Sequence, residues 1–243
     1  MTMTVLLQTE VRRALDTRSS RWLLSVAAVL SLVALILTND VQPTLDAFVT
    51  APGAPLAVLL PIVAVISAGA DRSHRANVVT YTLVPRRTHI VLARTAALFV
   101  VVTTTGMAAS VSAALMFVLM HPAQVGHSDW RAVLMGTLSV AAVSVSSAAH
   151  GIAAASVVRS AALSVVVVLL APLSIEIAAT LFVPTIAPWI SALALPAWLA
   201  RPHLAWGSVG DDPGVGHVLV SFVVWFVVPF VIGTRRQVTE DLH

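Results

Sequence analysis

Residues 70–94 read ADRSHRANVVTYTLVPRRTHIVLAR, and this stretch decides how the whole chain is interpreted. It is the most polar run in the first two-thirds of the sequence, and long apolar segments lie on both sides. Its five arginines favour the cytoplasmic side of a membrane, where positively charged loops accumulate. Asp71 or Ser73 can cap a short helix there, and Pro85 predicts the end of that helix because it disfavours helical geometry at Val84. A short, partly apolar helix between two membrane spans suits docking to another protein better than chemistry.

The composition is that of an integral membrane protein. Of the 243 residues, 58% are hydrophobic and only 10% are charged, and the mean hydropathy is +0.93. A soluble domain of this length would carry roughly 25% charged residues. Several nearly uncharged runs extend over about 20 residues, which is the length that a helix needs to cross the hydrocarbon core of a bilayer.

The residue types that are missing exclude several kinds of chemistry. There is no cysteine, which excludes disulfides and thiolate metal sites. All 14 Lys+Arg residues are arginine, and the lack of lysine excludes a P-loop and a Schiff-base mechanism. No metal-ligand spacing is found, even among Asp211, Asp212, His203 and His217. We therefore expect no catalytic residue, metal or cofactor in the chain itself, and arginines that anchor at lipid headgroups rather than bind nucleic acid.

Hydropathy predicts an all-α membrane protein with a single transmembrane domain over residues 1–243. The six predicted spans are residues 22–38, 54–70, 90–120, 132–156, 161–183 and 217–233. Residues 1–21 predict an amphipathic helix in the membrane interface. A cleaved signal peptide is the weaker alternative, because no small-residue cleavage pattern follows. Residues 71–88 form the polar cytoplasmic segment. Residues 184–216 predict short outer helices, since a structureless connection of this length is unusual.

The distribution of arginines sets the orientation of the six spans. Twelve of the 14 arginines lie in segments that would be cytoplasmic, and only Arg131 and Arg201 would face outward. An even number of spans returns both termini to the same side. We therefore expect a multi-pass protein of the cell membrane with both termini in the cytoplasm.

Two ionisable residues lie inside the apolar segments. Glu176 is about 16 residues into the fifth span, roughly 24 Å from its inner end by helical rise, which places it near the outer leaflet. A carboxylate in a span is a functional candidate by default, and an interface residue satisfied by water or by the outer helices is an equally good interpretation. His150, in the fourth span, can line a pathway, although bonding to a neighbouring helix is the more common role. The serine and small residues of that span predict close helix packing.

The polar segment carries a pattern that can be compared with a known family. An acidic residue and arginines precede a short helix that ends in Leu83-Val84-Pro85-Arg86-Arg87, and Arg94 then opens the third span. This pattern resembles the integral membrane subunit of type-2 ABC exporters. Asp71 stands where that family often has Glu, and Arg94 stands where it usually has Lys. Ala76-Asn77 departs from a frequent Gly-Thr pair.

Two further segments are similar to that family: residues 10–22 to its amphipathic N-terminal helix, and Leu195-Pro196-Ala197 to its outer Leu-Pro element. The resemblance implies pairing with a second permease, identical or paralogous, and attachment of a cytoplasmic ABC ATPase dimer that holds ATP and Mg²⁺. The polar segment would be the coupling helix, with ATPase-coupling roles for Asp71, Arg72, Arg75, Val79, Leu83, Pro85, Arg86 and Arg87. The candidates for a pathway or gate are Glu176, His150 and Pro196.

The implied function is ATP-driven export of a hydrophobic or amphipathic cargo, such as a drug, a lipid or a peptide, across a bacterial cell membrane. An ion-coupled secondary transporter is an alternative. It would need ionisable groups near the midplane, for which only Glu176 and His150 are available. A membrane enzyme or a non-transporting scaffold is the other alternative. An enzyme would show clustered acid–base or metal ligands at one membrane face, and the sequence shows no such cluster.

Overall fold

The computed structural model describes residues 3–41, 43–73, 87–158, 160–192, 194, 198 and 214–240. Every regular element in these residues is helical. In chain order the elements are α1 (Met3–Asp16), α2 (Arg18–Val41), α3 (Leu45–Thr50), α4 (Gly53–Ser73), α6 (Arg87–Met120), the 3₁₀ turn η1 (Pro122–His127), α7 (Trp130–Val157), α8 (Ala161–Phe182), α9 (Ala187–Ile190), α11 (Val215–Phe222), the π-helical turn η2 (Val223–Val227) and α12 (Val228–Glu240).

Six helical stretches in the described residues are long and apolar enough to cross a membrane, as predicted. They are Arg18–Asn39, Leu45–Gly69, Leu92–Met120, Trp130–Val157, Ala161–Phe182 and Val215–Gly233. Each of the six predicted spans falls largely within one of these stretches. An all-helical architecture with six candidate spans is therefore confirmed for the part of the chain that the structure describes.

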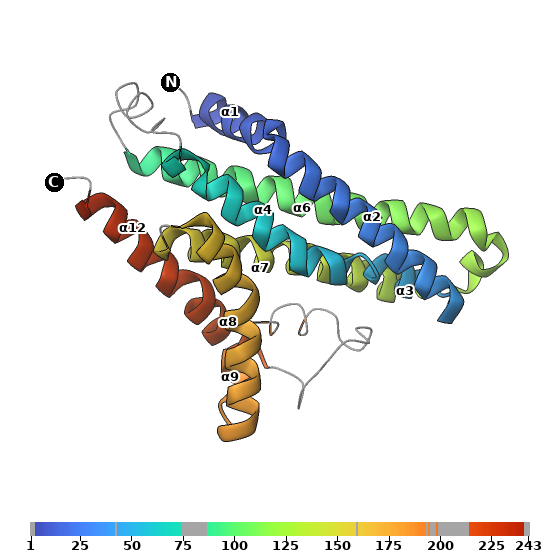
Figure 1. Ribbon diagram of the computed structural model, residues 1–243. Helices are drawn as coiled ribbons and strands as arrows, with labels where there is room; N and C mark the ends of the chain where they lie inside the picture. The colour runs from blue at the N-terminus through green and yellow to red at the C-terminus, as the bar shows by residue number, and fades with distance from the viewer. Residues whose placement is uncertain are drawn as a thin grey trace.

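The bundle is centred on α4 and α7, which pack against each other (Figure 1). α4 also contacts α2, α6 and α8, and α7 also contacts α3, α6, α8 and α12. A small residue permits the central contact, because a Cβ at Gly151 would lie 2.6 Å from Cβ of Ala64 and would meet the backbone oxygen of Pro61. The buried core formed by α4, α6 and α7 includes Leu56, Leu60, Leu98, Val102, Val140 and Ile152.

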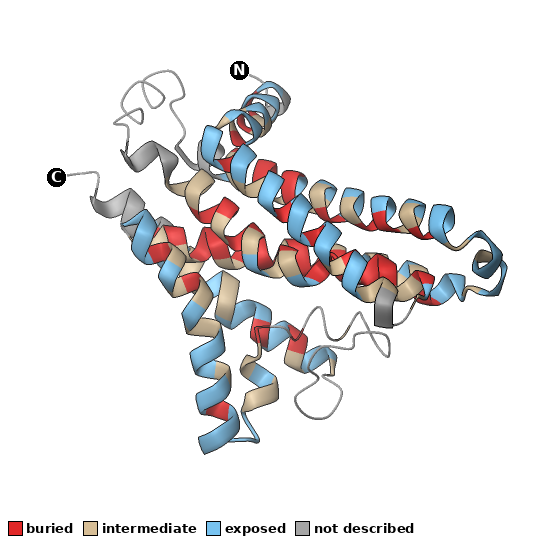
Figure 2. Cartoon of the chain, turned by 45° about the vertical axis from the view of Figure 1, so that its right-hand side comes forward, coloured by how far each residue is buried: buried red, intermediate tan, exposed pale blue. Residues whose placement is uncertain are grey.

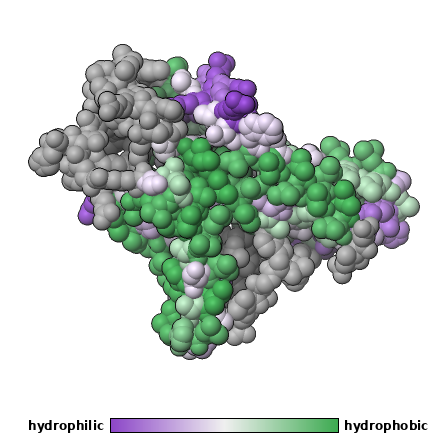
Figure 3. All heavy atoms as spheres, viewed as in Figure 1, coloured by the Kyte–Doolittle hydropathy of each residue, from purple (hydrophilic) through white to green (hydrophobic). Residues whose placement is uncertain are grey.

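Large apolar side chains cover much of the outer surface. Figure 2 shows exposed residues along α8 and α2. Figure 3 shows apolar residues over most of the described surface on one face, with polar residues at α1 and at the opposite, right-hand end of the molecule. On α8, side chains that are more than half exposed include Leu170, Leu173, Leu181 and Phe182. A soluble protein rarely exposes a contiguous apolar surface of this kind. Such helices fit a multi-pass membrane protein, in which they face lipid tails or another subunit.

Several helix ends gather at one end of the molecule. Figure 1 shows the start of α1, the end of α4, the start of α6 and the end of α12 there. The two helices that flank residues 74–86 therefore emerge close to both ends of the described chain. Residues 74–86, which include most of the predicted coupling helix, lie outside the described residues.

The structure corrects the boundary of the predicted N-terminal helix. The helix predicted over residues 1–21 ends at Asp16, and Arg18 begins the helix of the first span. Thr17 lies between the two helices, where its Oγ1 donates a 2.6 Å hydrogen bond to Oγ of Ser20. The backbone N–H of Arg21 donates a 3.1 Å hydrogen bond to the backbone oxygen of Thr17, so the helical bonding of α2 begins at this residue.

The boundaries of the polar segment also shift. α4 continues to Ser73, so Asp71 belongs to the last turn of the second span helix rather than to the start of a separate helix. α6 begins at Arg87, so Arg87 and Thr88 belong to the helix of the third span rather than to the segment predicted over residues 71–88.

The connection between the first two spans contains a helix that was not predicted. α3 buries Leu45, Phe48 and Val49, which have the i, i+3, i+4 spacing of one helical face. The ring of Phe48 packs edge-on against Phe117 of α6, with centroids 5.2 Å apart. The second candidate span therefore begins at Leu45, earlier than the predicted residues 54–70.

Candidate functional site

The described residues contain only part of the predicted ATPase-coupling set. Asp71 and Arg72 lie in the last turn of α4, and Arg87 is the first residue of α6. The remaining predicted residues lie outside the described part of the chain: Arg75, Val79, Leu83, Pro85, Arg86 and, in the outer segment, Pro196. Two further groups of polar contacts in the described residues involve charged or predicted site residues. One is the junction of α1 with α6, and the other is where α8, α9 and α11 meet.

A buried acidic residue fixes α1 to α6. Leu6, Glu10 and Ala14 follow the four-residue spacing of one helical face, and all three are buried. Nε of Arg94, on α6, lies 3.4 Å from Oε2 of Glu10, and Nη1 of Arg13 lies 4.0 Å from Oε1. Glu10 is only 7% exposed, so the two arginines compensate a carboxylate that would be costly to bury alone.

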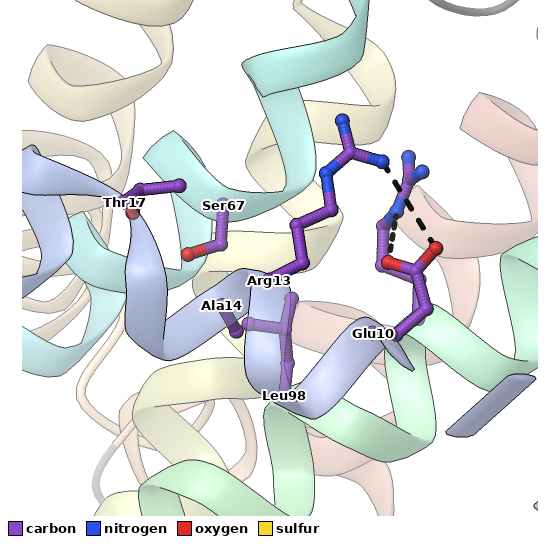
Figure 4. Close-up of a pocket in the computed structure, with 7 residues that line it drawn as sticks. Glu10, Arg13, Ala14, Thr17, Ser67 and Leu98 are labelled. Carbon is purple, nitrogen blue, oxygen red and sulfur yellow. Dashed lines mark hydrogen bonds and ion pairs between the residues drawn. The ribbon is translucent and has the colours of Figure 1, made fainter. Parts of the chain in front are cut away.

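A small pocket lies beside this ion pair (Figure 4). Its lining residues come from α1, α4, α6 and the turn between α1 and α2: Glu10, Arg13, Ala14, Thr17, Ser67, Arg94 and Leu98. Its volume of about 20 Å³ holds about one water molecule, which excludes it as a cargo site. The hydroxyls of Ser20 and Ser67 lie 3.4 Å apart and connect the start of α2 to α4. We interpret this region as a structural junction of four helical elements.

Glu176 is tied to the segment that follows α9. Oγ of Ser191 donates a 2.8 Å hydrogen bond to Oε1 of Glu176. Oγ of Ser221, on α11, donates a 2.5 Å hydrogen bond to the backbone oxygen of Ser191. The Glu176 side chain is partly exposed, whereas Ser221 is buried. Ser191 therefore joins α8 to α11, which accords with the interpretation of Glu176 as a residue that contacts the outer segment.

Trp225 connects the same segment to His150. It lies in η2, and its Nε1 donates a 2.6 Å hydrogen bond to the backbone oxygen of Ile190. Its ring packs edge-on against His150 of α7, with centroids 5.7 Å apart. Ser191 contacts Glu176, and the preceding residue, Ile190, accepts the hydrogen bond of Trp225, which packs against His150. These contacts connect Glu176 to His150. A π-helical turn at such a position is notable because these turns are frequent at functional sites.

His217, at the start of α11, makes contacts that hold the local structure. Nδ1 of His217 accepts a 2.9 Å hydrogen bond from the backbone N–H of Gly214, and its ring packs edge-on against Trp189, with centroids 4.2 Å apart. Within the residues that the structure describes, no group of three or more His, Cys, Asp or Glu is placed to hold a metal ion.

Sequence reasoning missed the residues that complete these contacts. Glu10 was not singled out from the sequence, although its four-residue spacing from the buried Leu6 and Ala14 was an available signal for its burial. Its partner Arg94 is 84 positions away, a pairing that no local pattern shows. Ser191 and Trp225 have no distinguishing pattern, because their roles depend on how the outer segment folds back.

The chain was compared with protein-family models, with curated proteins and with solved structures. No family model, no curated protein and no solved structure matches it.

Proposed function

We propose that this chain is the membrane subunit of an ABC-type exporter. A separate cytoplasmic ATPase dimer supplies the energy, and the cargo passes between this chain and a second permease. The observation that carries the proposal is the basic Leu83-Val84-Pro85-Arg86-Arg87 pattern in the connection between α4 and α6. The ends of these two helices gather with α1 and α12 at one end of the molecule, which supports a common docking face (Figure 1).

The amino-acid composition supports an assembly in which another subunit binds ATP. Without lysine the chain has no P-loop of its own, so an ATP-driven function requires a partner that carries one. The arginine distribution supports a cytoplasmic position for both termini and for residues 71–88, in the cell membrane of a bacterium. The exposed apolar faces of α8 and α2 support contact with lipid and with a second permease.

The packing offers a route from the docking segment to the spans. α4 contacts α7 and α8, and α6 contacts α7 and α1. α6 has 34 residues and extends about 51 Å at 1.5 Å per residue, well beyond the roughly 30 Å hydrocarbon core. A force on residues 74–86 would therefore act on two long helices, and α1 would follow α6 through the Glu10–Arg94 ion pair. Packed rigid helices of this kind can transmit motion between distant sites.

The test is purification of the tagged chain from its native membranes, followed by assay of ATP hydrolysis and of export in vesicles. We expect a soluble subunit with a P-loop to copurify in stoichiometric amount. Replacing Val79 and Leu83 together with Asp should abolish the coupled ATPase activity while the protein still inserts. These positions are four residues apart and share one face of the predicted coupling helix.

Tyr81→Asp is the matched control, because position 81 falls on the opposite side of that helix, about 200° from position 79 at 100° per residue. The proposal expects coupled activity to survive in this variant. Equal activity of the wild type and the Val79/Leu83 double variant would contradict the proposed docking face. Export that depends on an ion gradient and needs no ATPase would instead favour the secondary transporter.

A further inference from the structure

Glu176 is the acidic residue that lies deep in an apolar span. It occurs six residues before the end of α8, a helix whose candidate span has a mean hydropathy of 2.4 and is only 6% buried. In the described part of the chain, its carboxylate contacts one polar side chain, the hydroxyl of Ser191, through Oε1. No described arginine pairs with it. Among the described residues, a negative charge at this position is therefore stabilised by a single side-chain hydrogen bond.

This arrangement leaves the carboxylate incompletely compensated. A carboxylate has two oxygens and about four acceptor positions, and the bond from Ser191 uses one of them. Ionisable groups in membrane spans are costly, and they generally have a partner or a functional ligand. Glu176 is partly exposed, so a ligand can reach it without unfolding the helix. Within the described residues, the partner that this carboxylate lacks is a positive charge.

The surface around Glu176 favours an apolar body attached to that charge. Leu173, one helical turn before Glu176, is 57% exposed, and Ile177, the next residue, is 52% exposed. A cation next to Glu176 could therefore lay an alkyl or aromatic group along α8. A hydrated inorganic ion would gain nothing from these side chains.

The hydrogen bonds behind Glu176 hold it in position. Ser191, its donor, is itself fixed by Ser221, and the preceding carbonyl of Ile190 is fixed by Trp225. The donor to the carboxylate thus has its backbone anchored to α11 and η2. Preorganisation of this kind reduces the conformational entropy that the protein loses when a ligand binds.

We propose that Glu176 forms a binding site for lipophilic organic cations, such as tertiary amines or quaternary ammonium and phosphonium compounds with apolar substituents. The carboxylate pairs with the cationic centre, and the exposed apolar side chains of α8 contact the rest of the molecule. As an assignment of cargo this inference rests on the proposed export function. As a binding site it does not, because binding requires no ATPase.

The test measures binding to the purified chain in nanodiscs of zwitterionic lipid. The probes are tetraphenylphosphonium and tetraphenylborate, which have nearly the same shape and opposite charges. We expect saturable binding of the cation, and an increase of about tenfold or more in its Kd for Glu176→Gln, an effect of the size that loss of a partly buried ion pair produces. Tetraphenylborate should show no saturable binding above that of empty nanodiscs.

Two further variants keep the test decisive. Asp16→Asn removes one acidic charge from an exposed position of α1 and should bind the cation like the wild type. Glu176→Asp keeps the charge and should retain more of the affinity than Glu176→Gln. Equal Kd values for the wild type and Glu176→Gln, or equal saturable binding of the two probes, would overturn the site. Saturable cation binding by a chain that associates with no ATPase would overturn only the export proposal. Association with an ATPase by a chain that does not bind the cation would overturn only the cation site.

Discussion

The ion pair between α1 and α6 gives the most direct prediction about how the helices are held together. Replacing Glu10 with Gln keeps the size of the side chain and removes its charge. Oε2 of Glu10 lies 3.4 Å from Nε of Arg94, and the two side chains are 8% and 20% exposed. The change therefore leaves Arg94 in a largely buried position with a weaker partner.

The degree of burial sets the size of the effect. Breaking a fully buried pair by removing one partner costs about 3–5 kcal/mol, whereas an exposed pair contributes about 0–1 kcal/mol. The intermediate burial of Arg94 places the coupling free energy at about 2 kcal/mol. This corresponds to a change of about 30-fold in the ratio of docked to undocked α1.

The exposed Asp16–Arg21 ion pair is the matched control, because it separates the effect of burial from the effect of the distance between the charged groups. Asp16 and Arg21 form a shorter ion pair, 2.7 Å, but their side chains are 70% and 63% exposed. An account based on distance alone would assign this pair the larger contribution. Our account expects Asp16→Asn to leave the docking of α1 unchanged to within about 0.5 kcal/mol, because solvent screens an exposed pair.

The assay uses the fact that the chain has no cysteine. Spin labels at cysteines introduced at Gln8 of α1 and Met107 of α6, both exposed, report the distribution of distances between the helices. A double-mutant cycle with Glu10→Gln and Arg94→Gln then isolates the coupling free energy. Fully additive effects of the two substitutions, or a docked population unchanged by Glu10→Gln, would refute the assigned role of the ion pair.

Two further predictions concern the packing of the bundle and of the outer segment. Gly151→Leu should destabilise the bundle by about 1–3 kcal/mol or prevent folding, because even a Cβ at this position would lie 2.6 Å from Cβ of Ala64, and a lower midpoint in thermal unfolding would show it. Trp225→Phe removes the donor to the backbone oxygen of Ile190, so hydrogen exchange in residues 187–192 should rise about fivefold for a loss of about 1 kcal/mol. Exchange in α4 should not change, and Trp189→Phe, which keeps a ring against His217, should leave the outer segment protected.

The long apolar runs made the span assignments readable from the sequence. The helix predicted over residues 161–183 is found at Ala161–Phe182, because Ser160 caps its start and the hydropathy drops after Val183. The small residues of the fourth span predicted close packing, and Gly151 against α4 provides it. Periodicity and hydropathy are local properties, so they locate a helix and the residues that let it approach a neighbour.

The polar contacts could not be predicted in the same way. Glu10 and Arg94 are far apart in the sequence, and their pairing depends on how α1 lies against α6. The link from Glu176 to Ser191 likewise requires the chain to turn back after α8. The break at Thr17 also went unrecognised, because neither proline nor glycine marks it. Tertiary arrangement decides each of these features, and a single sequence does not show it.

The position of residue 79 in the assembled complex tests the central claim. A single cysteine at Val79, in a chain without other cysteines, can be labelled with a maleimide that does not cross membranes. The account predicts labelling only in inside-out vesicles, and loss of that labelling when the ATPase is bound. Labelling from the outer side, or undiminished labelling in the complete complex, would contradict a cytoplasmic docking segment held by a separate ATPase.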